Sequence, residues 1–337
     1  IIATLVSRHF NNDVRTFGIR FEGDDFDEGK YQNIIVDYLN TAHTQLKATN
    51  EIIGKTLPDV IWHCEQPLLR TGPIPLYLLS NMVTKNNYKV VLTGEGADEI
   101  FGGYNIFREA KVRNFWARQP DSKFRGLLIR RLYPYIFKEK RLGKMLEAFF
   151  AKSLDQVDDP LFSHIVRWNN TSKIKYFLSN DIKKTLKNKD LYNDLKQQLP
   201  DSFNSMDYLT KAQFLEINLF LSKYLLASQG DRVAMGNSLE IRLPFLDYRI
   251  IEFMSKVPPK WKIRGLNEKY ILKKSFNKII PDEIINRPKK PYRAPIARSL
   301  LNNNTKSYRN NLLSKKMLKK AGLFNPAYVK RLFEKLE

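Results

Sequence analysis

The chain has 337 residues, of which 43% are hydrophobic and 27% are charged, so it can bury a sizeable core and is not a disordered chain. It contains 15 glycines and 16 prolines, too few for a collagen-like protein, and no apolar run reaches the roughly 18 residues of a membrane span. The single cysteine, Cys64, excludes an internal disulfide and a metal site with several cysteine ligands, which fits a reducing, cytoplasmic compartment.

Basic residues outnumber acidic ones by 57 to 35, a net charge of +22 that suggests anionic partners. Segment 111–145 carries eleven Lys and Arg against two acidic residues, and segment 306–337 carries nine against two. Apolar residues at helical spacing accompany these charges, which favours solvated faces of amphipathic helices. Neither zinc-finger spacing nor an RNA-binding aromatic signature is present, so nucleic acid is the weaker interpretation and we expect no membrane partner.

Strand and helix patterns alternate through the first 110 residues, and the rest of the chain is mostly helical in pattern. The spacing predicts a helix over 1–10, a strand over 14–21, a helix over 28–40, a strand over 45–48, a helix over 73–84 and a strand over 89–93. This alternation indicates βαβ units, hence an α/β fold with a parallel sheet and flanking helices. We expect an α/β unit over 1–110, a basic helical insert over 111–200 and a further helical part over 201–337.

The most informative stretch reads Leu92-Thr93-Gly94-Glu95-Gly96-Ala97-Asp98-Glu99-Ile100-Phe101-Gly102-Gly103-Tyr104. A buried strand ends at Thr93, and a helix starts near Ala97 or one turn earlier, at the sheet edge where α/β proteins bind ligands. If that helix includes Glu95, then Glu95, Asp98 and Glu99 share one face. A Mg²⁺ ion between the carboxylates and a phosphate, or one carboxylate acting as a general base, would explain them. The structural alternative is that the acidic residues only stabilise the first turn of a helix.

Two later stretches are also dense in charge. From Asp231 to Asp247, charged and apolar residues are mixed too closely for a plain amphipathic helix, and Arg232, Glu240 and Arg242 could form a partly buried ion network. From Arg287 to Arg293, prolines keep an extended loop that carries four positive charges. A stiff basic loop suits a polyphosphate, although the pattern considered alone slightly favours a solvated basic loop.

These three stretches, in this order, resemble the synthetase domain of the asparagine synthetase family. The family signature S-G-E-G-x-D-E-x-F-G-G-Y matches Thr93 to Tyr104 except at the first residue, where Thr keeps the hydroxyl. The later S-x-E-x-R-x-P-F-L-D segment matches Ser238 to Asp247, and the K-x-x-L-R and R-x-K segments resemble Lys269 to Lys273 and Arg287 to Lys289. The resemblance implies a nucleotide-binding fold of the adenine nucleotide alpha hydrolase-like, ATP-pyrophosphatase type, whose site the part over 201–337 completes.

The resemblance also implies a reaction and roles for individual residues. Family members activate a carboxylate with ATP and Mg²⁺, release pyrophosphate, and let ammonia displace AMP to leave an amide. By position, Glu95 resembles the general base for ammonia attack, Asp98 a ligand of Mg²⁺ and pyrophosphate, and Lys289 the residue that stabilises phosphate charge. The remaining candidates are Thr93, Gly94, Gly96 and the backbone of Ile19 at the nucleotide, and Tyr104, Asp231 and Arg232 around the acceptor pocket.

Two departures from the family pattern stand out. The pyrophosphate-binding loop S-G-G-x-D-S and the glutaminase domain with its N-terminal cysteine nucleophile are not in this chain, which lacks an initiator Met. We expect both to lie upstream, and we expect the chain alone to be inactive. The second departure is the segment from Pro67 to Pro75, where many relatives carry a different pattern, so the acceptor pocket can differ from one built for aspartate.

Three functions compete at this stage. The first is an ATP-dependent, glutamine-fed amidotransferase that makes asparagine or a related amide, with a homodimer left open. The second is a β-lactam-forming relative, which uses a tyrosine–glutamate pair as its base, so the presence of Glu95 argues against it. The third is a non-catalytic, basic relative that binds nucleic acid, against which the intact Glu95, Asp98 and Lys289 argue.

Overall fold

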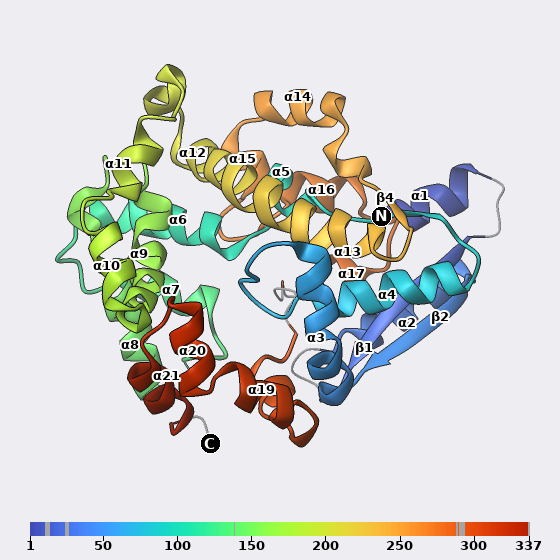
Figure 1. Ribbon diagram of the computed structural model, residues 1–337. Helices are drawn as coiled ribbons and strands as arrows, with labels where there is room; N and C mark the ends of the chain where they lie inside the picture. The colour runs from blue at the N-terminus through green and yellow to red at the C-terminus, as the bar shows by residue number, and fades with distance from the viewer. Residues whose placement is uncertain (11–13, 24–26, 138, 288, 290–293, 336–337) are drawn as a thin grey trace.

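The computed structural model describes residues 1–10, 14–23, 27–137, 139–287, 289 and 294–335. Helices dominate, and the few strands lie together with the first helices at one side of the molecule (Figure 1). A second, purely helical part lies at the other side, and the C-terminal helices run beneath both (Figure 1). In the described part of the chain, every helix is too short or too polar to cross a lipid bilayer.

The first part of the chain is the α/β unit that the sequence predicts. Its elements are α1 (Ile2–His9), β1 (Arg15–Phe21), α2 (Gly29–Leu39), β2 (Ala42–Ala48), α3 (Asn50–Cys64), α4 (Pro73–Lys85), β3 (Val90–Leu92) and α5 (Ala97–Phe101). The six predicted elements are all confirmed, while α3 is additional. Helix α3 has a sequence signal that periodicity alone misses, because the hydroxyl of Thr49 caps it by accepting a hydrogen bond from the Ile52 amide at 3.2 Å.

The strands form two parallel pairs. Strand β1 pairs with β2 in a register that runs from Arg15 opposite Ala42 to Phe21 opposite Ala48. Strand β3 pairs with β4 (Glu240–Arg242), which comes from the C-terminal third of the chain. The predicted parallel arrangement is therefore confirmed, but β4 was not predicted, because a three-residue strand with two charged residues has no readable alternation.

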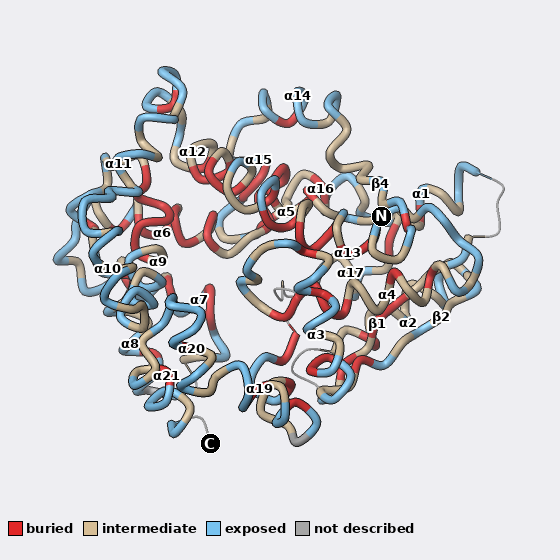
Figure 2. The backbone as a smooth tube through the Cα atoms, in the orientation of Figure 1, coloured by how far each residue is buried: buried red, intermediate tan, exposed pale blue. Residues whose placement is uncertain are grey.

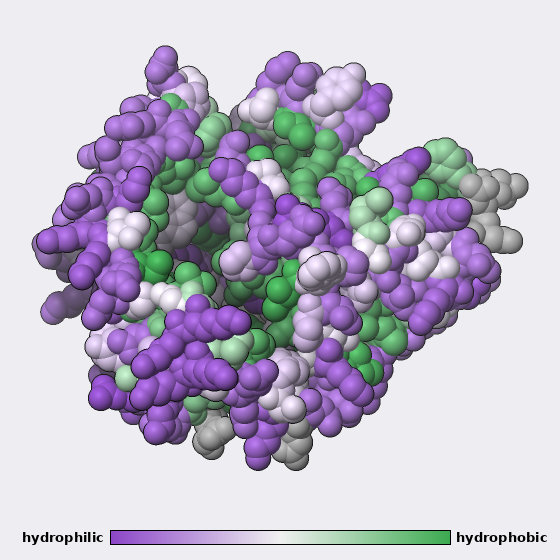
Figure 3. Space-filling view, in the orientation of Figure 1, coloured by the Kyte–Doolittle hydropathy of each residue, from purple (hydrophilic) through white to green (hydrophobic). Residues whose placement is uncertain are grey.

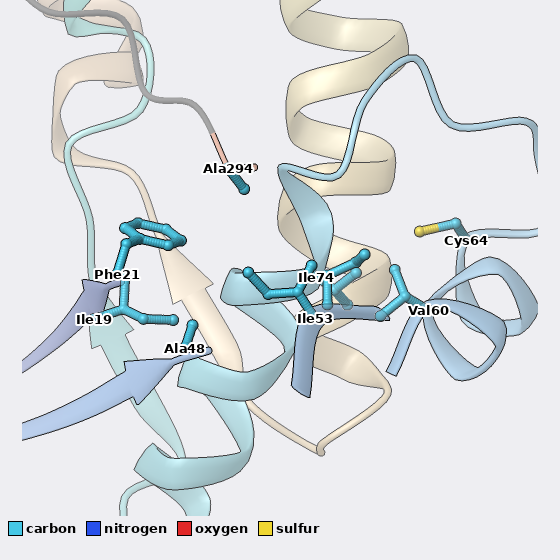
Figure 4. Packing of buried hydrophobic residues seen from close by; sticks show 9 residues of the cluster. Ile19, Phe21, Ala48, Ile53, Val60, Cys64, Ile74 and Ala294 are labelled. Atoms are coloured by element: carbon cyan, nitrogen blue, oxygen red, sulfur yellow. The ribbon is translucent and has the colours of Figure 1, made fainter. Parts of the chain in front are cut away.

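The main core of the α/β unit lies between the β1–β2 pair and helices α3 and α4. Ile19 and Phe21 of β1 and Ala48 of β2 face Ile53 of α3 and Ile74 of α4, and all are less than 8% exposed (Figure 4). Burying five such side chains contributes on the order of 1–3 kcal/mol each before conformational entropy is counted. Figure 2 shows that buried backbone continues from here into the helices that follow β3.

The middle of the chain is helical, as predicted, with its own core. Its elements are α6 (Asn105–Ala117), η1 (Arg125–Leu127), α7 (Leu128–Leu132), α8 (Lys140–Phe150), η2 (Leu154–Gln156), α9 (Phe162–Thr171), η3 (Ser172–Phe177), α10 (Asn180–Leu186), α11 (Leu191–Lys196) and η4 (Asp201–Ser205). Trp116 of α6, Ile129 of α7 and Phe150 of α8 are the centre of this second core.

The last third returns to the α/β unit. Its elements are α12 (Tyr208–Leu215), the π-helix η5 (Glu216–Asp231), α13 (Arg232–Met235), β4, η6 (Pro244–Leu246), α14 (Tyr248–Lys256), α15 (Pro259–Lys262), α16 (Tyr270–Ser275), α17 (Asp282–Ile285), α18 (Ala297–Leu300), η7 (Asn303–Thr305), α19 (Lys306–Leu312), α20 (Lys315–Ala321) and α21 (Pro326–Phe333). Helices α13 and α4 are in contact, and α16 contacts α5, so residues distant in sequence meet around the end of β3.

Candidate active site

The loop between β3 and α5 is shaped by its glycines. Gly96 is the residue before the helix and has φ of +85°, in the left-handed region, and a Cβ there would lie only 2.1 Å from the Leu246 side chain. Around Gly94, by contrast, an added Cβ would meet no atom within 4 Å. The first glycine thus leaves the backbone open to the space above the loop, and the second permits the turn that starts α5 at Ala97.

The Asp98 carboxylate is held between two lysines from distant parts of the chain. Lys289 Nζ donates a hydrogen bond to Asp98 Oδ2 at 2.9 Å, and Lys269 Nζ lies 2.9 Å from Oδ1. Burial acts to raise the pKa of Asp98, but the two ammonium groups outweigh it and hold that pKa below its usual range. Asp98 is therefore an ionised carboxylate paired with two cations at the start of α5.

Glu95 lies on the loop itself and is oriented by its neighbour. The hydroxyl of Thr93 donates a hydrogen bond to Glu95 Oε2. This contact explains why a hydroxyl is useful at the one position where the sequence departs from the family signature. Because the helix begins only at Ala97, Glu95 does not belong to α5 and is free to face the space beyond the loop.

The helix starts at Ala97, as the sequence first suggests, so the shared face that a helix including Glu95 would give Glu95, Asp98 and Glu99 does not form, and Glu99 points into the interior. The Glu99 side chain is 1% exposed and accepts a hydrogen bond from the Tyr104 hydroxyl at 2.8 Å. Burial raises the pKa of Glu99, and this effect outweighs the hydrogen bond from Tyr104, which lowers it. The resulting pKa is about 7. Two adjacent carboxyl groups thus have opposite environments.

A cavity of about 960 Å³ lies between β1, β3, α4, α13 and α16. Its wall includes Thr93, Gly94, Glu95 and Lys289, four of the residues singled out in the sequence. The charged side chains that line it are Arg15, Glu95, Glu268, Lys269, Lys273, Arg287 and Lys289, so cations outnumber carboxylates. A cavity of this size, with more cations than carboxylates in its wall, suits a nucleoside triphosphate.

The other sequence candidates lie outside this wall. The Ile19 side chain is 7% exposed and points into the core (Figure 4), whereas Thr16 and Phe17 of the same strand line the cavity. Asp98 lies behind its two lysines, Gly96 is buried under Leu246, and Tyr104 has its ring 5.6 Å from the Lys289 ammonium.

The partly buried ion network expected among Arg232, Glu240 and Arg242 is also wrong. Arg242 Nε pairs with Glu240 Oε1 at 2.7 Å, but the two side chains are 63% and 56% exposed, because both residues lie on the open face of β4. Arg232 instead donates a hydrogen bond to the Cys64 carbonyl, which ties α13 to the end of α3. Asp231 is exposed at the end of η5.

Lys269 is the residue that sequence reasoning missed. Its segment was noted, but no chemistry was assigned to it, because nothing local shows that its ammonium reaches Asp98. It caps α16 with φ of +51°, an uncommon conformation for lysine. The preceding Glu268 is 6% exposed and pairs with Arg108 at 3.2 Å and with Lys273 at 2.9 Å, which fixes the turn that directs Lys269.

The described residues offer a metal ion one carboxylate rather than a full protein cage. No group of three or more His, Cys, Asp or Glu side chains with metal-ligand spacing is found in the part of the chain that the structure describes. Asp98 Oδ1 is buried and lies 2.9 Å from Lys269 Nζ, so both carboxylate oxygens face lysines at this site. A single carboxylate beside a polyphosphate site fits Mg²⁺, which takes one or two carboxylates and completes its shell with phosphate oxygens and water.

The whole chain, residues 1–337, matches the family model described as asparagine synthase. The chain belongs to the asparagine synthase family. The resemblance that the sequence motifs carried is thereby confirmed, and so is the α/β fold class with its largely helical second half.

Curated relatives support the family assignment and show how much of each relative this chain covers. The chain is 30% identical over 308 residues to asparagine synthetase [glutamine-hydrolyzing] 1 of Bacillus subtilis, covering 90% of this chain and 46% of the relative. It is 24% identical over 307 residues to asparagine synthetase [glutamine-hydrolyzing] 3 of the same organism, covering 86% and 42%. It is also 28% identical over 305 residues to the amidase chyE of Penicillium rubens, covering 84% and 44%. The chain therefore spans about half the length of the curated relatives it matches.

Proposed function

We propose that this chain carries the synthetase site of an ATP-dependent ligase that adenylates a carboxylate and converts it to an amide with ammonia. The observation that carries the proposal is the basic cavity that Glu95, Lys269 and Lys289 line, with the Asp98 carboxylate held behind the two lysines. Aspartate is the acceptor that the names of the asparagine synthetase relatives favour, and asparagine, AMP and pyrophosphate would be the products.

The two lysines are suited to the adenylation step. When the acceptor carboxylate attacks the α-phosphate, negative charge builds up on the departing pyrophosphate oxygens, and fixed cations at that point lower the barrier. Lys289 is the better candidate for stabilising that charge, because it belongs to the basic stretch that begins at Arg287. Lys269 is anchored by the pairing of Glu268 behind it. Asp98 would hold Mg²⁺, which supplies charge neutralisation of the phosphates when bound.

Glu95 is suited to the second step. Ammonia must lose a proton after it attacks the acyl-adenylate, and a carboxylate on the loop beside the phosphate site can accept that proton. The Thr93 hydroxyl keeps the carboxylate in place. Thr93 and Gly94, with the backbone of Ile19, would border the nucleotide, while Gly96 shapes the turn. Tyr104, Asp231 and Arg232 would support the acceptor pocket without touching the substrate.

Ammonia would come from a glutaminase. The two Bacillus subtilis relatives are named glutamine-hydrolysing enzymes, and each is about twice as long as the region that this chain covers. We therefore propose a glutaminase domain as the partner of this site in the full-length protein, in the cytoplasm, with ATP and Mg²⁺ as its cofactors.

A screen of AMP formation tests the proposal. The full-length protein is incubated with ATP, Mg²⁺, glutamine and single carboxylic acids, and AMP and the amide are quantified. We expect AMP in a one-to-one ratio with a new amide for L-aspartate or a related carboxylate. ADP as the nucleotide product, or AMP formed without any amide, would contradict the proposed reaction.

A further inference from the structure

Helices η3, α10, α20 and α21 come from two distant segments of the chain but form one surface. The Ser179 hydroxyl, at the start of α10, donates a hydrogen bond to the Gly322 carbonyl, at the end of α20, at 2.7 Å. The rings of Tyr176 in η3 and Tyr328 in α21 stack with their centroids 4.4 Å apart. The Lys183 ammonium of α10 lies 5.6 and 5.3 Å from these two centroids. We call the surface of these four helices the lysine face; α10, α20 and α21 lie on the same side of the molecule in Figure 1.

The lysine face concentrates the positive charge of the chain. Its four helices contain nine lysines, one arginine and one acidic residue, Asp181, so they carry a net charge of +9 out of +22 for the whole chain. In the described part of the chain, no carboxylate lies within 4 Å of the ammonium groups of five exposed lysines, Lys173, Lys175, Lys184, Lys319 and Lys320. Like charges that gather on one surface repel one another and attract an anionic partner.

Exposed apolar side chains accompany these lysines. Ile174, Leu323 and Leu332 are 59%, 51% and 39% exposed, and the Tyr176 ring is also open to solvent. Aliphatic side chains gain nothing from contact with phosphate groups alone. Aliphatic groups, lysines and a tyrosine on one surface are the combination that proteins use at the boundary between lipid headgroups and acyl chains.

The same residues fit a nucleic acid less well. Arg331 is the single arginine of the four helices, whereas arginine is the residue that suits bidentate recognition of phosphates and bases. The rings of Tyr176 and Tyr328 stack on each other, so the faces that meet are not open to nucleic-acid bases. Charge and apolar exposure together therefore favour a lipid surface.

We propose that the lysine face binds the surface of an anionic lipid bilayer. The lysines lie against the headgroup charges, and Ile174, Leu323 and Leu332 enter the headgroup region. This inference goes beyond the proposed function, because the cavity lined by Glu95 and Lys289 is formed by other elements. The expectation of no membrane partner came from the lack of a spanning segment, and binding to a bilayer surface does not need one.

Cosedimentation of the full-length protein with vesicles tests the inference. The vesicles consist either of phosphatidylcholine alone or of equal parts phosphatidylcholine and phosphatidylserine. We expect binding to the second kind only. Combined replacement of Lys173, Lys184, Lys319 and Lys320 by Gln should lower the partition coefficient at least about 100-fold, because each lysine near such a surface contributes a factor of about five.

A matched variant controls for total charge. Replacement of Lys30, Lys47, Lys55 and Lys85 by Gln removes the same charge from exposed positions of the α/β unit. This variant should bind the anionic vesicles within about threefold of the wild type, because its lysines lie outside the lysine face. AMP formation equal to that of the wild type shows that both variants are folded.

A second variant tests the apolar contribution without changing charge. Ile174→Ser combined with Leu332→Ser should weaken binding to the anionic vesicles about 10-fold, because two side chains no longer transfer from water to lipid. Binding of this variant to polyuridylate, a single-stranded polyanion without lipid, should equal that of the wild type.

Three results would overturn the inference. Equal binding to both kinds of vesicle would show that headgroup charge plays no part. An equal loss in the two lysine variants would assign the effect to net charge instead of the lysine face. Tight binding of polyuridylate that depends on the four lysines, together with unchanged vesicle binding in the serine variant, would assign the face to nucleic acid. Each of these results leaves the proposed function intact, since AMP formation is measured separately.

Discussion

Asp98 and Glu99 are neighbours in sequence but differ in charge state because their surroundings differ. Asp98 faces two ammonium groups, which keep its pKa low, whereas Glu99 is enclosed by protein and receives one hydrogen bond from Tyr104. The Glu99 backbone carbonyl accepts a hydrogen bond from Gln213, which in turn accepts one from Lys262 at 3.0 Å. One carboxyl group is therefore available to the site, and the other fixes the helix that presents it.

The raised pKa of Glu99 predicts a pH-dependent stability. In the unfolded chain this carboxyl ionises near 4.5, and in the folded chain near 7. The folded chain therefore binds this proton more tightly than the unfolded chain does. The resulting stabilisation is fully present below about pH 4.5 and is lost as the pH rises to about 7. We expect Glu99→Gln, which imitates the protonated form, to be more stable than the wild type at pH 8, by about 3 kcal/mol at most. At pH 5 the difference should nearly vanish.

Urea unfolding at a series of pH values measures this difference. Glu147→Gln is the matched control, because that carboxylate pairs with Arg130 at the surface of α8. A stability difference between Glu99→Gln and the wild type that does not change between pH 5 and pH 8 would mean that Glu99 keeps an ordinary pKa.

Some of the site could be predicted from residues alone, and some could not. The stretch from Thr93 to Asp98 is recognisable because glycines and carboxylates directly follow a strand, at the sheet edge where α/β proteins bind ligands. Lys269 has no such signal, because its role depends on a contact with Asp98 far away in the chain.

At the scale of elements, one arginine joins the helices of the middle part. Arg113 of α6 is 1% exposed and donates to the carbonyls of Phe150 at 3.2 Å, Lys152 at 2.9 Å and Phe162 at 2.7 Å. These carbonyls lie at the end of α8, just beyond it, and at the start of α9. Burial lowers the pKa of Arg113 to about 10, yet it stays charged at neutral pH. The single guanidinium therefore joins the end of α8, the turn after it and the start of α9 through three hydrogen bonds.

We predict that Arg113→Met lowers the free energy of unfolding by about 3 kcal/mol, because three hydrogen bonds from a buried charged group are lost. Arg131→Met, in the same basic segment but at the surface, should change it by less than about 0.5 kcal/mol. Chemical denaturation of both variants measures the contrast. Equal effects of the two substitutions would show that the buried hydrogen bonds of Arg113 are not needed.

This contrast also explains where sequence reasoning stops at the element scale. The basic segment over 111–145 was interpreted as solvated helix faces, which is correct for Arg131 but not for Arg113. Strand β4 was missed for a related reason, since Glu-Ile-Arg becomes a strand only by pairing with β3. Periodicity reports the face that a helix or strand presents, but it does not report which distant element covers that face.

At the scale of the whole molecule, the C-terminal helices join the two parts. The Tyr308 hydroxyl of α19 donates to the Gly54 carbonyl of α3 at 2.7 Å. Further on, the Ser179 amide donates to the Leu323 carbonyl at 2.9 Å, and the Asn325 amide donates to the Phe177 carbonyl at 2.8 Å. In Figure 1 these helices lie below both the α/β unit and the helical part, and in Figure 3 the surface between the parts is hollowed, with hydrophobic walls inside a hydrophilic rim.

The site depends on this long-range assembly. Glu95 follows β3, Asp98 lies in α5, Lys269 precedes α16 and Lys289 follows α17, so no contiguous stretch contains the chemistry. The sequence predicted the fold class and the loop after β3, while the boundaries at 110 and 200 stay predictions. The expected phosphate-binding loop and glutaminase also stay predictions.

The most direct test of the central claim is ATP–pyrophosphate exchange, measured with labelled pyrophosphate in the full-length protein in the presence of L-aspartate. The exchange reports adenylation alone. We predict that Lys289→Met loses it by at least about 100-fold, because the phosphate charge loses a nearby cation, whereas Glu95→Gln keeps it and loses only amide formation. Normal exchange in Lys289→Met, or loss of exchange in Glu95→Gln, would contradict the account.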